Sequence, residues 1–174
     1  MTKLKLFVFV CALVTGFTAK AETIDTQATR ALLIDAATNV VLLAKNADER
    51  MPTSSMSKTM TIYVVFDALK KGSLHLGDLM LVSEKAWRME GSKMFIKVGD
   101  QVSVEDLIRG VIIQSGNDAT VTLAEGIAGS EQAFVDMMNA KAQELGMKDS
   151  HFANASGWPD PNHYSTAHDL ALLA

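Results

Sequence analysis

Two short β-prone runs are followed by a long series of helical patterns, and this order limits the possible folds more than any other feature. The runs at 30–35 and 40–45 are apolar and are separated by Ala-Ala-Thr-Asn, which predicts a two-stranded hairpin. A two-stranded sheet is only marginally stable by itself. We therefore expect an α+β fold in which a helical cluster packs on an antiparallel sheet, with only the N-terminal strands of that sheet present.

Composition supports one folded domain and excludes several classes of protein. The chain has 174 residues, of which 48% are hydrophobic, so it can form a core and is not intrinsically disordered. Its net charge of −4 argues against a nucleic-acid partner. One cysteine excludes a disulfide scaffold, and the four scattered histidines form no convincing ligand set. We expect neither a metal nor an organic cofactor.

Residues 1–21 have the pattern of a secretory signal peptide. Lys3 and Lys5 precede the apolar run 6–18, which is short for a membrane span, and Ala19-Lys20-Ala21 is a small-x-small cleavage signature. Cleavage there would remove three lysines and no acid, so the net charge would change from −4 to −7. The pattern predicts export across the inner membrane to the periplasm, with 22–174 as the mature domain.

Helical periodicity and capping residues predict most of the remaining elements. The helix expected over 55–71 ends at Gly72 and has Ile62, Val65, Phe66 and Leu69 on its apolar face. A short strand is expected at 79–82, an irregular segment at 84–93 and a turn-rich loop at 154–164. Ser or Thr at a helix start predicts further helices, at 103–114, 130–146 and from 166 onward, with another helix at 118–127.

Ser55-Met-Ser-Lys58 is the first motif that can carry chemistry. Residues three apart share a helix face, so the Lys58 amine can reach the Ser55 hydroxyl. A serine hydroxyl is a weak nucleophile and needs a base, and a lysine can act as that base when burial lowers its pKa. The stripe 55, 58, 62, 65, 69 places Lys58 on the predicted core side of the helix.

Spacing alone leaves other interpretations open. A Ser-x-x-Lys arises by chance in a chain of this length, with Ser55 as a helix cap and Lys58 as a surface residue. Ser54 stands four residues before Lys58 and can also face it. A Ser-His-Asp triad built on Ser55 is a further possibility, although the chain has no G-x-S-x-G motif.

Ser115-Gly-Asn117 lies between two predicted helices. Ser115 is a candidate for relaying a proton between Lys58 and a leaving group, and Asn117 for hydrogen-bonding a substrate amide. These residue types are equally ordinary in a turn between helices, so this motif has little weight alone.

Taken together, these motifs resemble the serine penicillin-binding and β-lactamase superfamily, and within it the low-molecular-weight D-alanyl-D-alanine carboxypeptidases. Pro52–Lys58 is similar to the first family motif and Gln114–Ala119 to the second. Further similar stretches cover nearly all of the predicted mature chain: Ser83–Trp87, Gly91–Phe95, Val98–Val102, Leu123–Ser130, His151-Phe152 and Asn154–Gly157.

The resemblance implies a β-lactamase/transpeptidase-like fold and an acyl-transfer reaction. It makes Ser55 the nucleophile, Lys58 its general base, Ser115 a catalytic partner and Asn117 a substrate-binding residue. The implied substrate is a peptidoglycan stem peptide that ends in D-Ala-D-Ala, with β-lactam antibiotics as inhibitors that acylate the same serine. Alternatives that remain are a D,D-endopeptidase with the same machinery and a non-catalytic scaffold that keeps the fold.

Two parts of the family pattern, the third motif and the C-terminal anchor, are not found in the sequence. The third family motif, Lys-Thr-Gly, is absent, because the only Lys-Thr pair, Lys58-Thr59, is followed by Met60. Residues 22–174 are therefore interpreted as an incomplete catalytic domain, barely active by itself, whose membrane association would depend on a missing C-terminal anchor.

A class A β-lactamase is disfavoured, because Gly116 stands where that class has Asp and no E-x-x-L-N motif follows.

Overall fold

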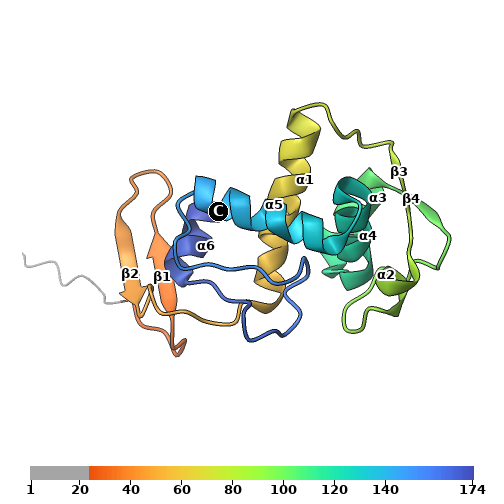
Figure 1. The fold of residues 1–174 in the computed structure, drawn as a ribbon. Helices are drawn as coiled ribbons and strands as arrows, with labels where there is room; N and C mark the ends of the chain where they lie inside the picture. Colours follow the sequence, from red (N-terminus) through yellow and green to blue (C-terminus); the bar gives the residue numbers. More distant parts are fainter. Residues whose placement is uncertain (1–23) are drawn as a thin grey trace, which may run out of the picture.

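The structure, a computed structural model, describes residues 24–174, and the signal peptide predicted at 1–21 lies outside them. Two antiparallel strand pairs are present: β1 (Ala31–Ile34) with β2 (Val41–Lys45), and β3 (Leu79–Leu81) with β4 (Gln101–Ser103). The first pair is the predicted hairpin. Figure 1 shows the two pairs at opposite ends of the molecule, with helices between them.

Three of the helices begin where capping residues predicted them. Ser103, Ser130 and Thr166 each accept a hydrogen bond from the backbone N–H three residues later, which fixes the starts of three helices. The helical elements are η1 (Ser54–Ser57), α1 (Lys58–Lys70), α2 (Glu84–Arg88), α3 (Val104–Gln114), α4 (Asn117–Ala128), α5 (Glu131–Glu144) and α6 (Ala167–Leu173).

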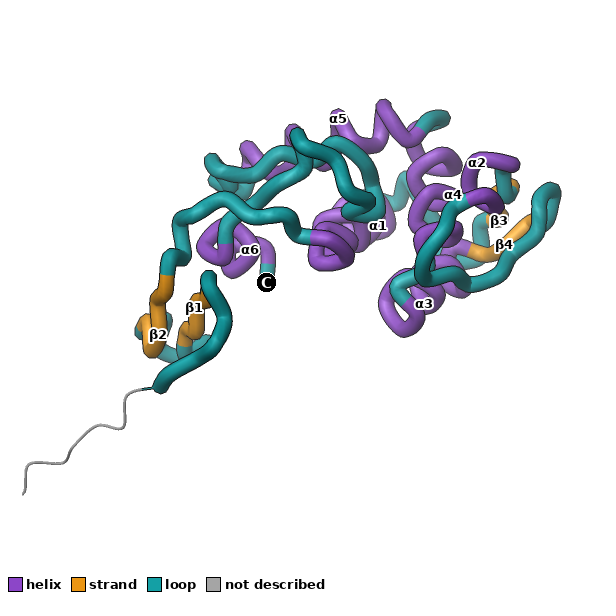
Figure 2. The backbone as a smooth tube through the Cα atoms, turned by 90° about the horizontal axis from the view of Figure 1, so that it is seen from below, coloured by secondary structure: helices purple, strands orange, loops and turns teal. Residues whose placement is uncertain are grey.

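Helix α4 is the centre of the core. Its first eight residues are all buried, and it contacts α1, α2, α3, α5 and β3. A helix that is enclosed on all sides needs apolar or internally satisfied side chains around its whole circumference. Thr120 and Thr122 meet this need by donating to backbone carbonyls four residues back. In Figures 1 and 2, α1 and α5 lie between the α3–α4 unit and the β1–β2 hairpin.

Four details differ from the sequence expectations. The first turn of the predicted 55–71 helix is a 3₁₀ turn, and the α-helix begins at Lys58. Of the predicted apolar face of α1, Ile62 and Val65 are buried but Phe66 is 49% exposed. The other buried apolar residues of this helix are Met60, Val64 and Ala68. The segment 84–93, expected to be irregular, begins with helix α2, capped by Ser83. Strand β4 was not predicted, since three residues form it only by pairing with β3.

The turn-rich segment after α5 returns to the start of η1. Met51 pairs with Ser165 and His151 with Tyr164 as isolated antiparallel bridges. These bridges hold the predicted 154–164 loop beside residues 51–58. Among residues 24–174, no helix is both long and apolar enough to cross a membrane.

Candidate active site

Lys58 and Ser55 meet at the junction of η1 and α1. The Lys58 Nζ donates to Ser55 Oγ at 3.1 Å and to the backbone carbonyl of Ser156 at 2.9 Å. Ser55 is exposed to solvent, whereas Lys58 is only 5% exposed. The interpretation of Lys58 as a surface residue is therefore wrong. That of Ser55 as a helix cap is also wrong, because Ser55 lies inside η1 and the residues at the N-cap positions of η1 and α1 are Thr53 and Ser57.

Burial lowers the pKa of the Lys58 ammonium from 10.5 to about 8. Desolvation disfavours the charged form of an amine, and no carboxylate near Lys58 opposes this effect among the causes of the shift. About a tenth of the molecules then carry a neutral amine at pH 7. A neutral amine within hydrogen-bond distance of a hydroxyl can remove its proton, as general-base activation of a serine requires.

Ser115 shares a pocket with this pair. The pocket has a volume of about 300 Å³ and is lined by Ser55, Lys58, Thr59, Ile62, Val111, Ile112 and Ser115. Ser115 ends α3 in the left-handed conformation, at φ 56°, which turns the chain sharply between α3 and α4. The structure therefore brings three of the four predicted site residues to one cavity that is open on one side.

Asn117 lies next to this pocket but is not among the residues that line it. Its side-chain amide donates to the carbonyl of Glu90 at 2.7 Å, and its backbone N–H donates to the carbonyl of Ser92 at 2.8 Å. Through these two hydrogen bonds, Asn117 holds the 89–93 segment against the turn between α3 and α4. Its binding of a substrate amide stays a prediction.

Asp118 is an anchoring residue that sequence reasoning missed. Its carboxylate is fully buried and accepts the backbone N–H groups of Met94 and Phe95, both at 2.8 Å. An acid in the first turn of a helix was visible in the sequence, but it indicates only a favourable interaction with the helix N-terminus. The distant partners in 94–95 appear only when the chain is folded.

His163 contacts Ser57 of the Ser55–Lys58 motif and not the candidate nucleophile Ser55. His163 Nε2 lies 2.7 Å from Ser57 Oγ, which in turn lies 2.6 Å from Thr53 Oγ1. His163 Nδ1 accepts the backbone N–H of Ala153 at 3.2 Å, so Nε2 carries the proton and donates to Ser57. His163 is thus a structural donor, and Lys58 rather than a histidine contacts Ser55.

We expect His163 to make the protein less stable in acid. Burial lowers the pKa of His163, Asp160 opposes this effect and His151 adds to it. Because the unfolded chain binds the proton more readily, stability conferred by neutral His163 is lost as the pH falls below about 6.5. A glutamine at 163 can make both hydrogen bonds without titrating, so His163→Gln should show a smaller loss in urea unfolding between pH 7.5 and 5.

The exposed His75 provides the control for this experiment. Its side chain is 73% exposed and pairs with Asp78 at the surface, where an ion pair contributes little, so His75→Gln should change the pH dependence much less than His163→Gln does. Equal pH dependence in the parent and His163→Gln would contradict the assigned tautomer and its role.

Comparison with known proteins identifies the family. A family model described as D-alanyl-D-alanine carboxypeptidase (Peptidase_S11) matches residues 15–174. The D-alanyl-D-alanine carboxypeptidase DacF of Bacillus subtilis is 43% identical over 148 residues, which are 85% of this chain and 38% of that protein. A D-alanyl-D-alanine endopeptidase of Pseudomonas aeruginosa is 35% identical over 144 residues, 82% of this chain and 45% of that protein.

Solved structures agree with this assignment. The D-alanyl-D-alanine carboxypeptidase DacD from Francisella tularensis matches with a TM-score of 0.84 at 43% identity, over 87% of this chain and 37% of that chain. The predicted penicillin-binding fold is therefore confirmed. The chain spans less than half the length of these relatives. Since the family model covers most of its residues, the chain belongs to the D-alanyl-D-alanine carboxypeptidase family, Peptidase_S11.

Proposed function

We propose that this chain supplies the nucleophile and general base of a serine-type D-Ala-D-Ala carboxypeptidase that acts on peptidoglycan stem peptides. The observation that carries the proposal is the buried Lys58 amine, 3.1 Å from the exposed Ser55 hydroxyl and in the same pocket as Ser115. Membership of the family makes D-Ala-D-Ala the substrate class that this chemistry fits.

The reaction begins with the neutral Lys58 amine taking the proton of Ser55 Oγ. The oxygen forms an ester bond with the carbonyl carbon between the two D-alanines, and the backbone N–H of Ser55 is one donor to the oxyanion. The C–N bond breaks, and the leaving D-Ala amine receives a proton from the Lys58 ammonium through Ser115. Water then hydrolyses the ester, which releases the shortened peptide and restores the Ser55 hydroxyl.

The place of action follows from the same proposal. Residues 1–21 would direct the chain across the inner membrane, and peptidoglycan lies in the periplasm. A C-terminal anchor of the kind found in typical family members would give peripheral attachment to the membrane. β-Lactams would inhibit the enzyme by acylating Ser55.

Intact-mass spectrometry after incubation with penicillin tests the nucleophile. We would use the 174-residue chain and a longer hybrid, in which a C-terminal segment of a family member that carries the third motif follows Ala174. The hybrid should gain one penicillin adduct, because Ser55, Lys58 and the third motif are then present together. The adduct should be lost in Ser55→Ala and retained in Ser54→Ala, which changes the neighbouring exposed serine.

An unlabelled hybrid that is folded by circular dichroism would support the non-catalytic scaffold instead. The 174-residue chain should label much more slowly than the hybrid, since the third motif is expected to bind the substrate carboxylate. Release of D-Ala from a pentapeptide, compared with cleavage of a crosslinked stem-peptide dimer, then distinguishes the carboxypeptidase from the endopeptidase.

A further inference from the structure

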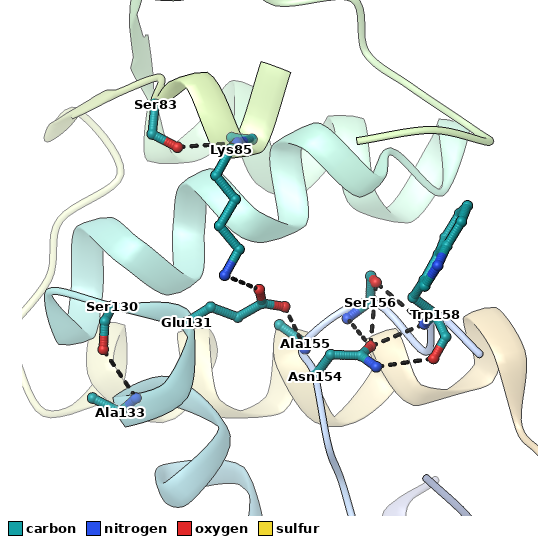
Figure 3. Close-up of polar contacts among 10 residues, drawn as sticks. Ser83, Lys85, Ser130, Glu131, Ala133, Asn154, Ala155, Ser156 and Trp158 are labelled. Carbon is teal, nitrogen blue, oxygen red and sulfur yellow. Dashed lines mark hydrogen bonds and ion pairs between the residues drawn. The ribbon is translucent and has the colours of Figure 1, made fainter. Parts of the chain in front are cut away.

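The Ser156 carbonyl, which accepts a hydrogen bond from Lys58 Nζ, lies in a tight turn at 154–158 (Figure 3). The Asn154 side chain closes this turn: its Oδ1 accepts the N–H groups of Ser156 at 3.2 Å and Trp158 at 2.9 Å, and its Nδ2 donates to the Trp158 carbonyl at 2.9 Å. The turn is therefore rigid internally. Its position relative to Lys58 must come from contacts with other elements.

Ala155 provides those contacts through both of its backbone groups, the carbonyl and the N–H. Its carbonyl accepts the hydroxyl of Thr61 in α1 at 2.6 Å, and its N–H donates to Glu131 Oε1 at 3.0 Å. Ala155 is fully buried and Ser156 is 2% exposed. Water is thus excluded from this peptide, and each backbone group depends on its protein partner.

Glu131 is the first residue of α5, directly after the capping Ser130. Figure 3 shows its carboxylate between two segments: one oxygen faces Ala155, and the other lies 2.7 Å from Lys85 Nζ of α2. The Glu131 side chain is only 11% exposed. A carboxylate this buried is retained only with partners, and here its partners are the Lys85 ammonium and the Ala155 N–H.

We propose that Glu131 is a positioning residue for the Ser55–Lys58 pair, because it holds the N–H of Ala155, and with it the 154–158 turn, so that the Ser156 carbonyl orients the Lys58 amine toward Ser55. The contacts form one connected path from Lys85 through Glu131 and Ala155–Ser156 to Lys58. The effect of these contacts on catalysis rests on the proposed function, whereas the contacts themselves do not depend on any reaction.

Loss of the contact between Glu131 and Ala155 should change the pKa of Lys58, which can be measured. Without the anchor, water reaches the amine, and desolvation no longer holds its pKa near 8. The pKa would rise toward 10.5, and the neutral fraction at pH 7 would fall. A purely structural role of Glu131 would lower the stability of the chain but would leave the Lys58 pKa in the folded state unchanged.

The experiment titrates the folded 174-residue chain, labelled with ¹³C at lysine Cε, by NMR. In Glu131→Ala, we expect the Lys58 midpoint to rise by about one unit. The Ala155 amide should exchange with solvent about tenfold faster, relative to the core amide of Val121. Glu131→Gln keeps an acceptor for Ala155 and loses only the charge, so its changes should have the same sign and be smaller.

Glu84→Gln is the matched control, since it removes an exposed ion pair with Arg88 in α2 and should change neither quantity. The proposal is overturned if Glu131→Ala leaves the Lys58 midpoint and the relative Ala155 exchange at the values of this control. If Glu131→Ala does not fold, the same criteria apply to Glu131→Gln. Both readouts work without turnover, so shifted values together with a folded hybrid that penicillin fails to label would refute the proposed function alone.

Discussion

Replacing Lys58 with methionine is expected to lower the rate of Ser55 acylation by about a thousandfold, the range for removal of a general base. Methionine has a similar length and no titrating group, so the Ser55 hydroxyl keeps its place and loses its proton acceptor. The measurement is the rate of penicillin adduct formation in the hybrid that contains the third motif. Lys70→Met is the control, because Lys70 is an exposed lysine of the same helix.

The pH dependence of acylation should follow the same residue. Because the Lys58 pKa is lowered to about 8, the rate in the parent should rise as the pH increases through about 8. The Lys58→Met variant should lack this rise. An unchanged rate and an unchanged pH profile in Lys58→Met would rule out Lys58 as the base.

The same substitution should not destabilise the fold. A folded pKa of about 8 against 10.5 corresponds to an upper limit of about 3 kcal/mol lost in burying the ammonium. The unfolded chain binds more protons between these two values, so the stability of the parent rises with pH across that range. Urea unfolding at pH 7 should therefore show Lys58→Met to be at least as stable as the parent, as expected when a residue is kept for chemistry.

Gly157→Ala is expected to have the largest effect on the fold around the site. A Cβ at this position would lie 1.8 Å from the Ser54 carbonyl oxygen and 3.0 Å from Ser57 Oγ, and the backbone φ is +78°. The clash is with backbone, which cannot rotate away as a side chain would. We expect the free energy of unfolding to fall by about 3 kcal/mol or more, since both overpacking and a left-handed alanine contribute.

Acylation of Ser55 should also be lost in this variant, because relief of the clash must move Ser54 and the turn that carries Ser55. Gly129→Ala is the matched control: its φ is +79°, but nothing lies within 4 Å of the added Cβ. That variant should lose about 1 kcal/mol and keep its acylation rate. Equal urea midpoints for the two variants would show that the close approach to Ser54 does not constrain the turn.

Local signals in the sequence predicted the elements that depend on local interactions. Ser103, Ser130 and Thr166 cap helices because each needs only a backbone N–H three residues away. Strand β4 and the exposure of Phe66 were missed for the opposite reason. A three-residue strand exists through its partner, and the buried side of α1 is decided by the helices against which it packs.

The same division applies to the candidate active site. Because the spacing of three residues between Ser55 and Lys58 reflects helix geometry, the sequence alone placed the two side chains on one face. Resemblance to a family then chose Ser55 over Ser54. The helical stripe also predicted Lys58 on the core side of the helix, and its burial confirms this. The sequence could not show that the amine contacts the 154–158 turn, which lies about a hundred residues farther along the chain.

By itself, the sequence determined the starts of the three helices capped by Ser103, Ser130 and Thr166, and the Ser55–Lys58 and Ser115–Asn117 motifs, all of which rest on contacts within a few residues. The order of its elements and its resemblance to a family also determined the fold class. Only the tertiary structure decided that Ser115 reaches the same pocket as Ser55, that His163 binds Ser57, and that Glu131 anchors the turn over Lys58. The physical reason is that a side chain's pKa and orientation are set by its solvent exposure and hydrogen-bond partners. In this protein those partners come from distant segments of the chain.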